Sequence, residues 1–261
     1  MAVLTALGVG VLVGVVVGAL GAGGGILSVP ALIYLLGQEP HDASAGSLVV
    51  VGLTAIVSLI APARAGRVHW RDGATFGLMS VLGALVGSRA SVAVDGTLLL
   101  TLFCVMLAVV GVVMLVRGLR SRKSPDDGGG SEKDSASARR GLLVVAAAAT
   151  FTGFLTGFFG VGGGFIVVPM LVLALGFPMK DASGTSLLVM IIASSAGLAA
   201  RVGTHSNVDW PVVLAFAAAS MVGGILGGPL TKRASASTLT TAFGLLLLGV
   251  CAFTAYDLLR A

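Results

Sequence analysis

Two glycine triplets stand out among the residues that could do chemistry, because glycine lets an anion approach backbone N–H groups closely. They consist of Gly23, Gly24 and Gly25, and of Gly162, Gly163 and Gly164. Each lies in a long apolar run, where a non-helical backbone is tolerated only if it is buried in protein or lines a cavity. A half-helix beginning after a triplet would point free N–H groups and the positive end of its dipole into that cavity. The triplets therefore predict an anion-binding site.

The alternative role for these glycines is close packing of helices. Small residues spaced four apart serve that purpose, and Gly83 with Gly87, and Gly223 with Gly227, fit it. The triplets are instead three glycines together, each followed by a proline. This pattern favours a break in the helix over packing alone.

A second pair of polar segments follows the triplets: "DASAGS" (42–47) and "DASGTS" (181–186). Their hydroxyls could hydrogen-bond to an oxyanion or could bond back to the helix backbone. The candidate substrate-binding hydroxyls are Ser44, Ser47, Ser183, Thr185 and Ser186. Asp42 and Asp181 precede apolar helices, which favours a role as N-caps, with proton coupling as the alternative.

Basic residues gather in "RAGRVHWR" (64–71). Arg64 and Arg67 could recruit an anion at the cytoplasmic mouth of a site, although basic loops also stay in the cytoplasm for reasons of topology alone. The three histidines lie in loops without metal-ligand spacing, and both cysteines fall inside apolar runs. Because those runs hold no histidine and almost no acid, we expect no catalytic residue, no metal site and no cofactor.

The composition is that of an integral membrane protein. Of its 261 residues, 56% are hydrophobic and 10% are charged, with a mean hydropathy of +1.05. A soluble domain averages about 25% charged residues. The apolar runs do not alternate with polar residues, which predicts helices and not a barrel. Basic cytoplasmic loops explain the net charge of +5, so we expect no nucleic-acid partner.

The chain contains an internal duplication. Shifted by 139 positions, residues 18–50 fall on residues 157–189 without a gap, and roughly half of the positions are identical. Shifted by 140, "VHW" (68–70) meets "VDW" (208–210). We expect a first transmembrane repeat at 1–117, a flexible polar linker at 118–140 and a second repeat at 141–261.

The predicted fold is all-α and polytopic, with about four transmembrane helices in each repeat. The expected spans are 3–36, 42–61, 72–93 and 97–117, and then 141–176, 182–200, 209–230 and 237–258. The first span of each repeat would be about 50 Å long as one helix, against about 30 Å of hydrocarbon, so it must break at the glycines. Eight spans would make the repeats parallel, with both termini and the linker in the cytoplasm, and the basic loops favour this arrangement. If the broken pieces cross separately, each repeat has five spans and the repeats are inverted.

The duplicated G-x-G-G-G-x4-P module, the D-A-S segment after it, and the "GRVHW" loop with its "SNVDW" counterpart resemble the sulfite exporter TauE/SafE family, also called the thiosulfate/sulfite/sulfonate anion transporter superfamily. The resemblance covers essentially everything but the linker. It implies an inner-membrane carrier that moves sulfite or organosulfonate anions, usually outward. It also implies that the glycine modules and D-A-S segments form the translocation site. Asn207 stands where the first half has Arg67, so the two copies need not be equivalent.

The sequence therefore favours a multi-pass transporter of the cell membrane with a small anionic substrate. A carrier for another small anion or a non-sulfur metabolite is the alternative, and a membrane-embedded enzyme has little support because the apolar runs lack catalytic groups. The oligomeric state is open, and a homodimer is one arrangement that the sequence allows.

Overall fold

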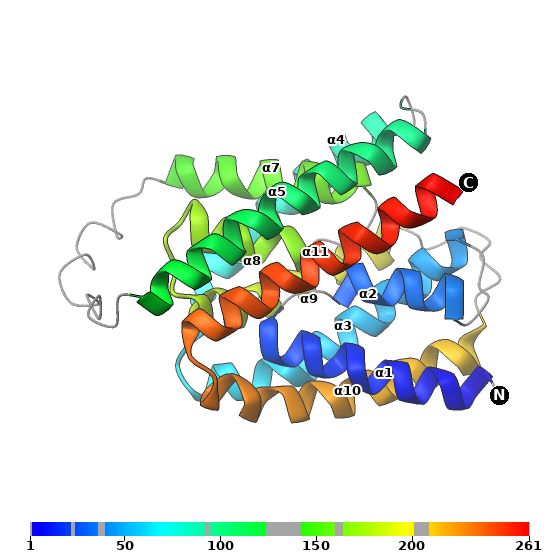
Figure 1. The fold of residues 1–261 in the computed structure, drawn as a ribbon, viewed down its shortest axis with the longest axis horizontal. Coiled ribbons are helices and arrows are strands. Elements are labelled where there is room, and N and C mark those ends of the chain that lie inside the picture. The colour runs from blue at the N-terminus through cyan, green and yellow to red at the C-terminus, as the bar shows by residue number, and fades with distance from the viewer. Residues whose placement is uncertain are drawn as a thin grey trace.

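The computed structural model describes residues 2–21, 24–35, 40–91, 94, 96–123, 142–159, 164–200 and 209–260. Every regular element in these ranges is a helix (Figure 1), as predicted. The first half contains α1 (Ala2–Leu20), α2 (Gly24–Pro30), the π-helical turn η1 (Ala31–Leu35), α3 (Pro40–Arg64), α4 (Trp70–Ser91) and α5 (Gly96–Lys123). The second half contains α7 (Leu142–Phe159), α8 (Gly164–Leu173), α9 (Met179–Ala200), α10 (Trp210–Arg233) and α11 (Ala236–Arg260).

Several of these helices can cross a membrane by length and composition. Within the described residues five long apolar segments qualify: Ala45–Arg64, Thr101–Arg120, Met179–Ala199, Trp210–Pro229 and Ala236–Tyr256. Thr5–Leu20 and Val145–Phe159 are apolar but shorter. The predicted class, a multi-pass helical membrane protein, is confirmed.

Described helices end before and begin after parts of both glycine segments. α1 ends at Leu20 and α2 begins at Gly24, while α7 ends at Phe159 and α8 begins at Gly164. Each half therefore has five helical segments in the described residues. α5 also continues to Lys123, past the expected start of the linker at 118.

Two pairs of helices, each with one member from either half, pack side by side and run in the same direction. Gly14 on α1 lies so close to α10 that a Cβ there would overlap the backbone of Ser220, and one at Gly18 would overlap Gly224. Contacts along α4 and α7 follow the same pattern. α1 thus runs parallel to α10, and α4 runs parallel to α7.

Helices at equivalent positions in the two halves are instead antiparallel. The Cys251 thiol on α11 lies 3.3 Å from the Cys104 carbonyl on α5. Near the end of α5, a Cβ at Gly118 would lie 2.8 Å from the backbone nitrogen of Thr241, near the start of α11. The contacts between α3 and α9 are also antiparallel.

The ends of the helices are arranged differently from what the parallel-repeat expectation implies. The beginning of α1 and the end of α11 lie at one end of the bundle, while the end of α5 and the beginning of α7, which flank the linker, lie at the other (Figure 1). The sequence placed all of these on one side. The difference arises because α2 and η1 carry the chain back after α1, so that each half passes through the bundle an odd number of times.

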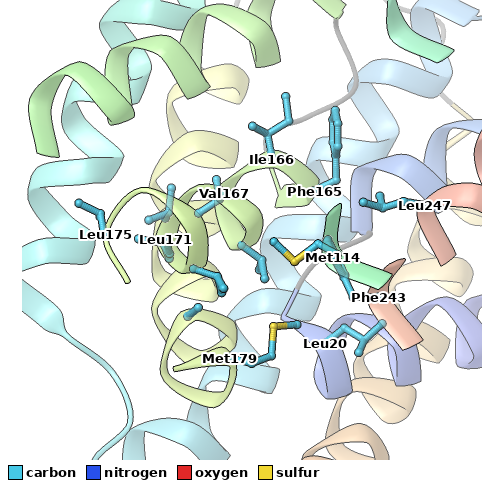
Figure 2. Packing of buried hydrophobic residues seen from close by; sticks show 14 of the residues in the cluster. Leu20, Met114, Phe165, Ile166, Val167, Leu171, Leu175, Met179, Phe243 and Leu247 are labelled. Carbon is cyan, nitrogen blue, oxygen red and sulfur yellow. The ribbon is translucent and has the colours of Figure 1, made fainter. Parts of the chain in front are cut away.

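Two clusters of buried apolar side chains fill the bundle. One is centred on α8, where Phe165, Ile166 and Val167 meet residues of α1, α2, α5, α9 and α11 (Figure 2). The other lies between α1, α3 and α10 and contains Val13 and Phe216. Both clusters combine side chains of both halves, so the halves fold into a shared core.

Candidate functional site

The turn at Gly21 ties the first half of the chain to the second. Gly21 has a left-handed backbone (φ +65°), which glycine adopts without a steric penalty. Its N–H donates to the Val17 carbonyl at 2.8 Å. Its carbonyl accepts a hydrogen bond from the Ser186 hydroxyl at 2.5 Å, and this hydroxyl also lies 2.8 Å from the Ser183 carbonyl. The glycine segment of the first half is therefore held by the D-A-S-G-T-S segment of the second.

A small cleft opens beside this turn, at the end of the bundle that carries the helix ends flanking the linker. About 330 Å³ of space lies between its walls, open solvent included, and about 20 Å³ of this is accessible to the centre of a water molecule. α1, the end of α3 with its following turn, the beginning of α9 and the end of α10 form its walls. The lining residues are Gly18, Ala61, Pro62, Ala65, Arg67, Lys180, Ser183, Gly228 and Thr231.

The cleft is positively charged. Arg67 and Lys180 both line it, and neither forms an ion pair with a carboxylate among the described residues. The nearest acid in sequence, Asp181, is 3.6 Å from the His69 imidazole instead. Ser183 is 4% exposed, and its hydroxyl forms no hydrogen bond within the described part of the chain. Two uncompensated cations and a free hydroxyl are suited to binding an oxyanion.

Arg67 is positioned by the turn after α3 and by the second half of the chain. Its N–H donates to the Pro62 carbonyl at 3.0 Å. Its carbonyl lies against Gly184, where an added Cβ would approach it to 2.8 Å. The N–H of His69 donates to the Thr185 hydroxyl at 3.2 Å. The backbone on both sides of Arg67 is therefore fixed against α9.

His69 forms a polar cluster that the sequence did not reveal. Its Nδ1 is 3.7 Å from Asp72 and its Nε2 is 3.6 Å from Asp181. Its ring also packs on Phe177, with 4.6 Å between the ring centroids. No sequence pattern relates this loop histidine to a segment more than a hundred residues away. The cluster links the turn that carries Arg67 to the beginning of α9.

Asp42 and Asp181 occupy the third positions of α3 and α9. They therefore lie in the first turns of these two helices. A carboxylate in the first turn still interacts favourably with the helix dipole. The side-chain surroundings of Asp42 and Ser44 lie outside the described residues.

Two other predicted site residues, Arg64 and Gly24, do not line the cleft. Arg64 is exposed in the last turn of α3 and does not line it. Gly24 is buried, and an added Cβ would lie 3.0 Å from Val51 Cγ2 and 3.1 Å from Met190 Cε. Gly25 and Gly164 lie in the first turns of α2 and α8, and nothing further is described of their surroundings. Gly23, Gly162 and Gly163 lie outside the described residues.

The structure does not gather all the predicted hydroxyls into one site. Ser47 is buried near the beginning of α3. Its neighbour Leu48 contacts Gly197 near the end of α9, where an added Cβ would be 3.0 Å away. Gly197 follows Ser186 by eleven residues, or about 16 Å of helix. Ser183, Thr185 and Ser186 are thus near the cleft, and Ser47 is toward the opposite end.

Two cleft residues were missed by the sequence analysis. Lys180 directly precedes Asp181, so the polar segment could have pointed to it. Thr231, whose hydroxyl donates to the Ala19 carbonyl at 2.9 Å, has no such signal because it stands alone at the end of an apolar helix.

Comparison with known proteins agrees with the family resemblance of the sequence motifs. The family model described as "Sulfite exporter TauE/SafE" matches residues 6–254. A "Probable membrane transporter protein" of Xylella fastidiosa (strain Temecula1) is 36% identical over 255 residues, covering 96% of this chain and 94% of the relative. The "Probable membrane transporter protein YunE" of Bacillus subtilis is 26% identical over 252 residues, covering 92% of each chain. No solved structure matches the chain.

Proposed function

Because this chain belongs to the sulfite exporter TauE/SafE family, a family of membrane transporters and not of enzymes, we propose that it is a secondary exporter of sulfite or of small organosulfur or sulfonate anions. The observation that carries the proposal is the charge of the cleft beside Gly21. Arg67 and Lys180 line it and have no carboxylate partner among the described residues, and the Ser183 hydroxyl, which forms no hydrogen bond to that part of the chain, lies in its wall. Such a site attracts an anion by charge and orients its oxygens by hydrogen bonds.

We propose that residues 1–117 and 141–261 are inverted repeats. The duplicated sequence supports this, as do the antiparallel contacts of α3 with α9 and of α5 with α11. A two-fold axis in the membrane plane reverses the direction of every helix that it relates. In this arrangement the beginning of α8 relates to α3 as the beginning of α2 relates to α9. The substrate would then meet one copy of the motif from each side of the membrane.

The distribution of basic residues orients the bundle in the proposal. The end that carries the cleft holds Arg64, Arg67, Arg71, Arg117, Arg120, Arg122, Lys123, Lys180, Lys232 and Arg233. Among the described residues, the opposite end holds Arg89 and Arg260. Basic ends stay in the cytoplasm, so the cleft and the linker face the cytoplasm and both termini face outward.

A cytoplasmic anion site suits export. An inside-negative potential already favours outward movement of an anion by about 2.3 kcal/mol per charge per 100 mV. Export of this kind needs no coupled proton, and the carboxylate of Asp181 is engaged with His69 in any case.

Flux measurements in proteoliposomes test the proposal. The panel is sulfite, thiosulfate, sulfoacetate, taurine and sulfate, with acetate as a non-sulfur anion. We expect flux of at least one sulfur oxyanion, and we expect Arg67→Ala combined with Lys180→Ala to lower kcat/KM about 100-fold, because two charge-assisted contacts are lost. Arg89→Ala, an exposed cation at the other end, is the matched control and should behave as wild type. Flux of acetate alone would favour the alternative anion carrier, and no flux of any anion would overturn the proposal.

A further inference from the structure

Two hydroxyls of α3 are buried without a hydrogen-bond partner. Thr54 is 1% exposed and Ser58 is 2% exposed, and neither side-chain oxygen has a partner in the described part of the chain. A helical hydroxyl usually bonds back to the carbonyl of the preceding turn, as Thr152 does to Ala148 at 2.7 Å. Leaving a hydroxyl unpaired in a membrane interior is unfavourable. These two side chains are therefore not explained by the stability of the fold.

Both hydroxyls continue the wall of the cleft into the bundle. Ser58 precedes Pro62 by four residues, and Thr54 precedes Ser58 by four, so all three lie on one face of α3. Pro62 lines the cleft. A Cβ at Gly224 on α10 would overlap the Ser58 hydroxyl, and one at Gly18, which also lines the cleft, would overlap Gly224. The hydroxyls thus lie one and two turns deeper than the cleft, at the contact of α3 with α10.

The second half does not repeat this pair of hydroxyls. With the shift of 139 that holds up to residue 50, the equivalent positions are Ala193 and Gly197, and with the shift of 140 that holds from residue 68 they are Ser194 and Leu198. Neither alignment places two hydroxyls there, so the pair as a whole is specific to the first half.

We infer that Thr54 and Ser58 form an inner binding position for the transported oxyanion, which is entered from the cleft when α10 separates from α3. This inference rests on the proposed function and adds a second position to it. In the low-dielectric interior, hydroxyl donors bind a partly dehydrated anion strongly. Because no cation is added at this depth, the anion is held by hydrogen bonds alone and can leave again.

The test compares Thr54→Val combined with Ser58→Ala against wild type, with the purified full chain. Thermal unfolding with and without sulfite or thiosulfate reports binding, and proteoliposome flux reports transport. We expect anion protection at the cleft to persist, because Arg67 and Lys180 are intact, while flux falls about tenfold or more. The melting temperature without anion should be equal to or higher than that of wild type, because unpaired hydroxyls have been removed. Thr54→Ser keeps a hydroxyl donor at position 54 and should therefore keep the flux that this position contributes.

A matched control and the separate outcomes make the result decisive. Thr152→Val removes a buried hydroxyl of α7 that bonds back to its own helix, and it should transport as wild type does. Wild-type flux in the double variant, with flux lost in the Arg67 and Lys180 variant, overturns the inner position alone. Neither binding nor flux in wild type overturns the proposed function and this inference together. A double variant that is less stable than wild type would show that the two hydroxyls are structural, and would also overturn the inference.

Discussion

At the scale of single residues, neighbouring hydroxyls of α9 have different roles. Ser186 bonds to the carbonyl of Gly21, whereas Ser183 leaves its hydroxyl free in the wall of the cleft. Sequence reasoning treated the two as equivalent candidates, because spacing alone cannot tell which hydroxyl finds a partner in the other half. The first is expected to hold the turn in place, and the second to contact the anion.

Ser186→Ala should destabilise the protein by about 0.5–1.5 kcal/mol, because the Gly21 carbonyl loses its donor in a buried place. The measurement is thermal or denaturant unfolding in detergent, with Ser195→Ala, an exposed hydroxyl on the same helix, as the control. Equal stability of the two variants would mean that the hydrogen bond to Gly21 contributes nothing.

At the scale of helices, the sequence supports predictions for single helices but not for how the helices pair. The excess length of each first span and the glycines within it are what predict a break in each of them. The partners were not predictable in the same way, because hydropathy is a property of one helix, while α1 packs on α10 and α4 on α7 through small residues from both halves. For the same reason the sequence missed that Gly21 contacts the polar segment of the other half.

Close packing of α1 on α10 gives a prediction with an internal control. A side chain at Gly14 would overlap the backbone of Ser220, whereas nothing lies within 4 Å of a Cβ at Gly8. Gly14→Val should therefore force the helices apart and cost about 2 kcal/mol or more, as overpacking does, while Gly8→Val should be close to neutral. The folded fraction by size-exclusion chromatography and the melting temperature would show the difference. A Gly14→Val protein as stable as Gly8→Val would contradict the close approach of the two helices.

At the scale of the whole molecule, the two ends of the bundle differ in charge and in the chain segments that they carry. The end with the cleft also carries the helix ends that flank the linker, and the opposite end carries the start of α1 and the end of α11 (Figure 1). The basic loops suggested that the residue 64–71 cluster, the linker and both termini share a side of the membrane. In the bundle, the helix ends beside the cluster and the linker lie together, whereas the start of α1 and the end of α11 lie at the other end (Figure 1).

The orientation of the bundle in the cell membrane is the corresponding prediction. A reporter that is active only outside the cytoplasm, such as alkaline phosphatase, should be active when fused after residue 261 and inactive when inserted in the linker at residue 130. A fluorescent protein that folds only in the cytoplasm should give the reverse pattern. The reason is that α5 and α11 are antiparallel neighbours, so their last residues must emerge on opposite sides of the membrane. The same reporter response at both positions would refute the inverted arrangement and restore the parallel one, in which four crossings return each half to its starting side.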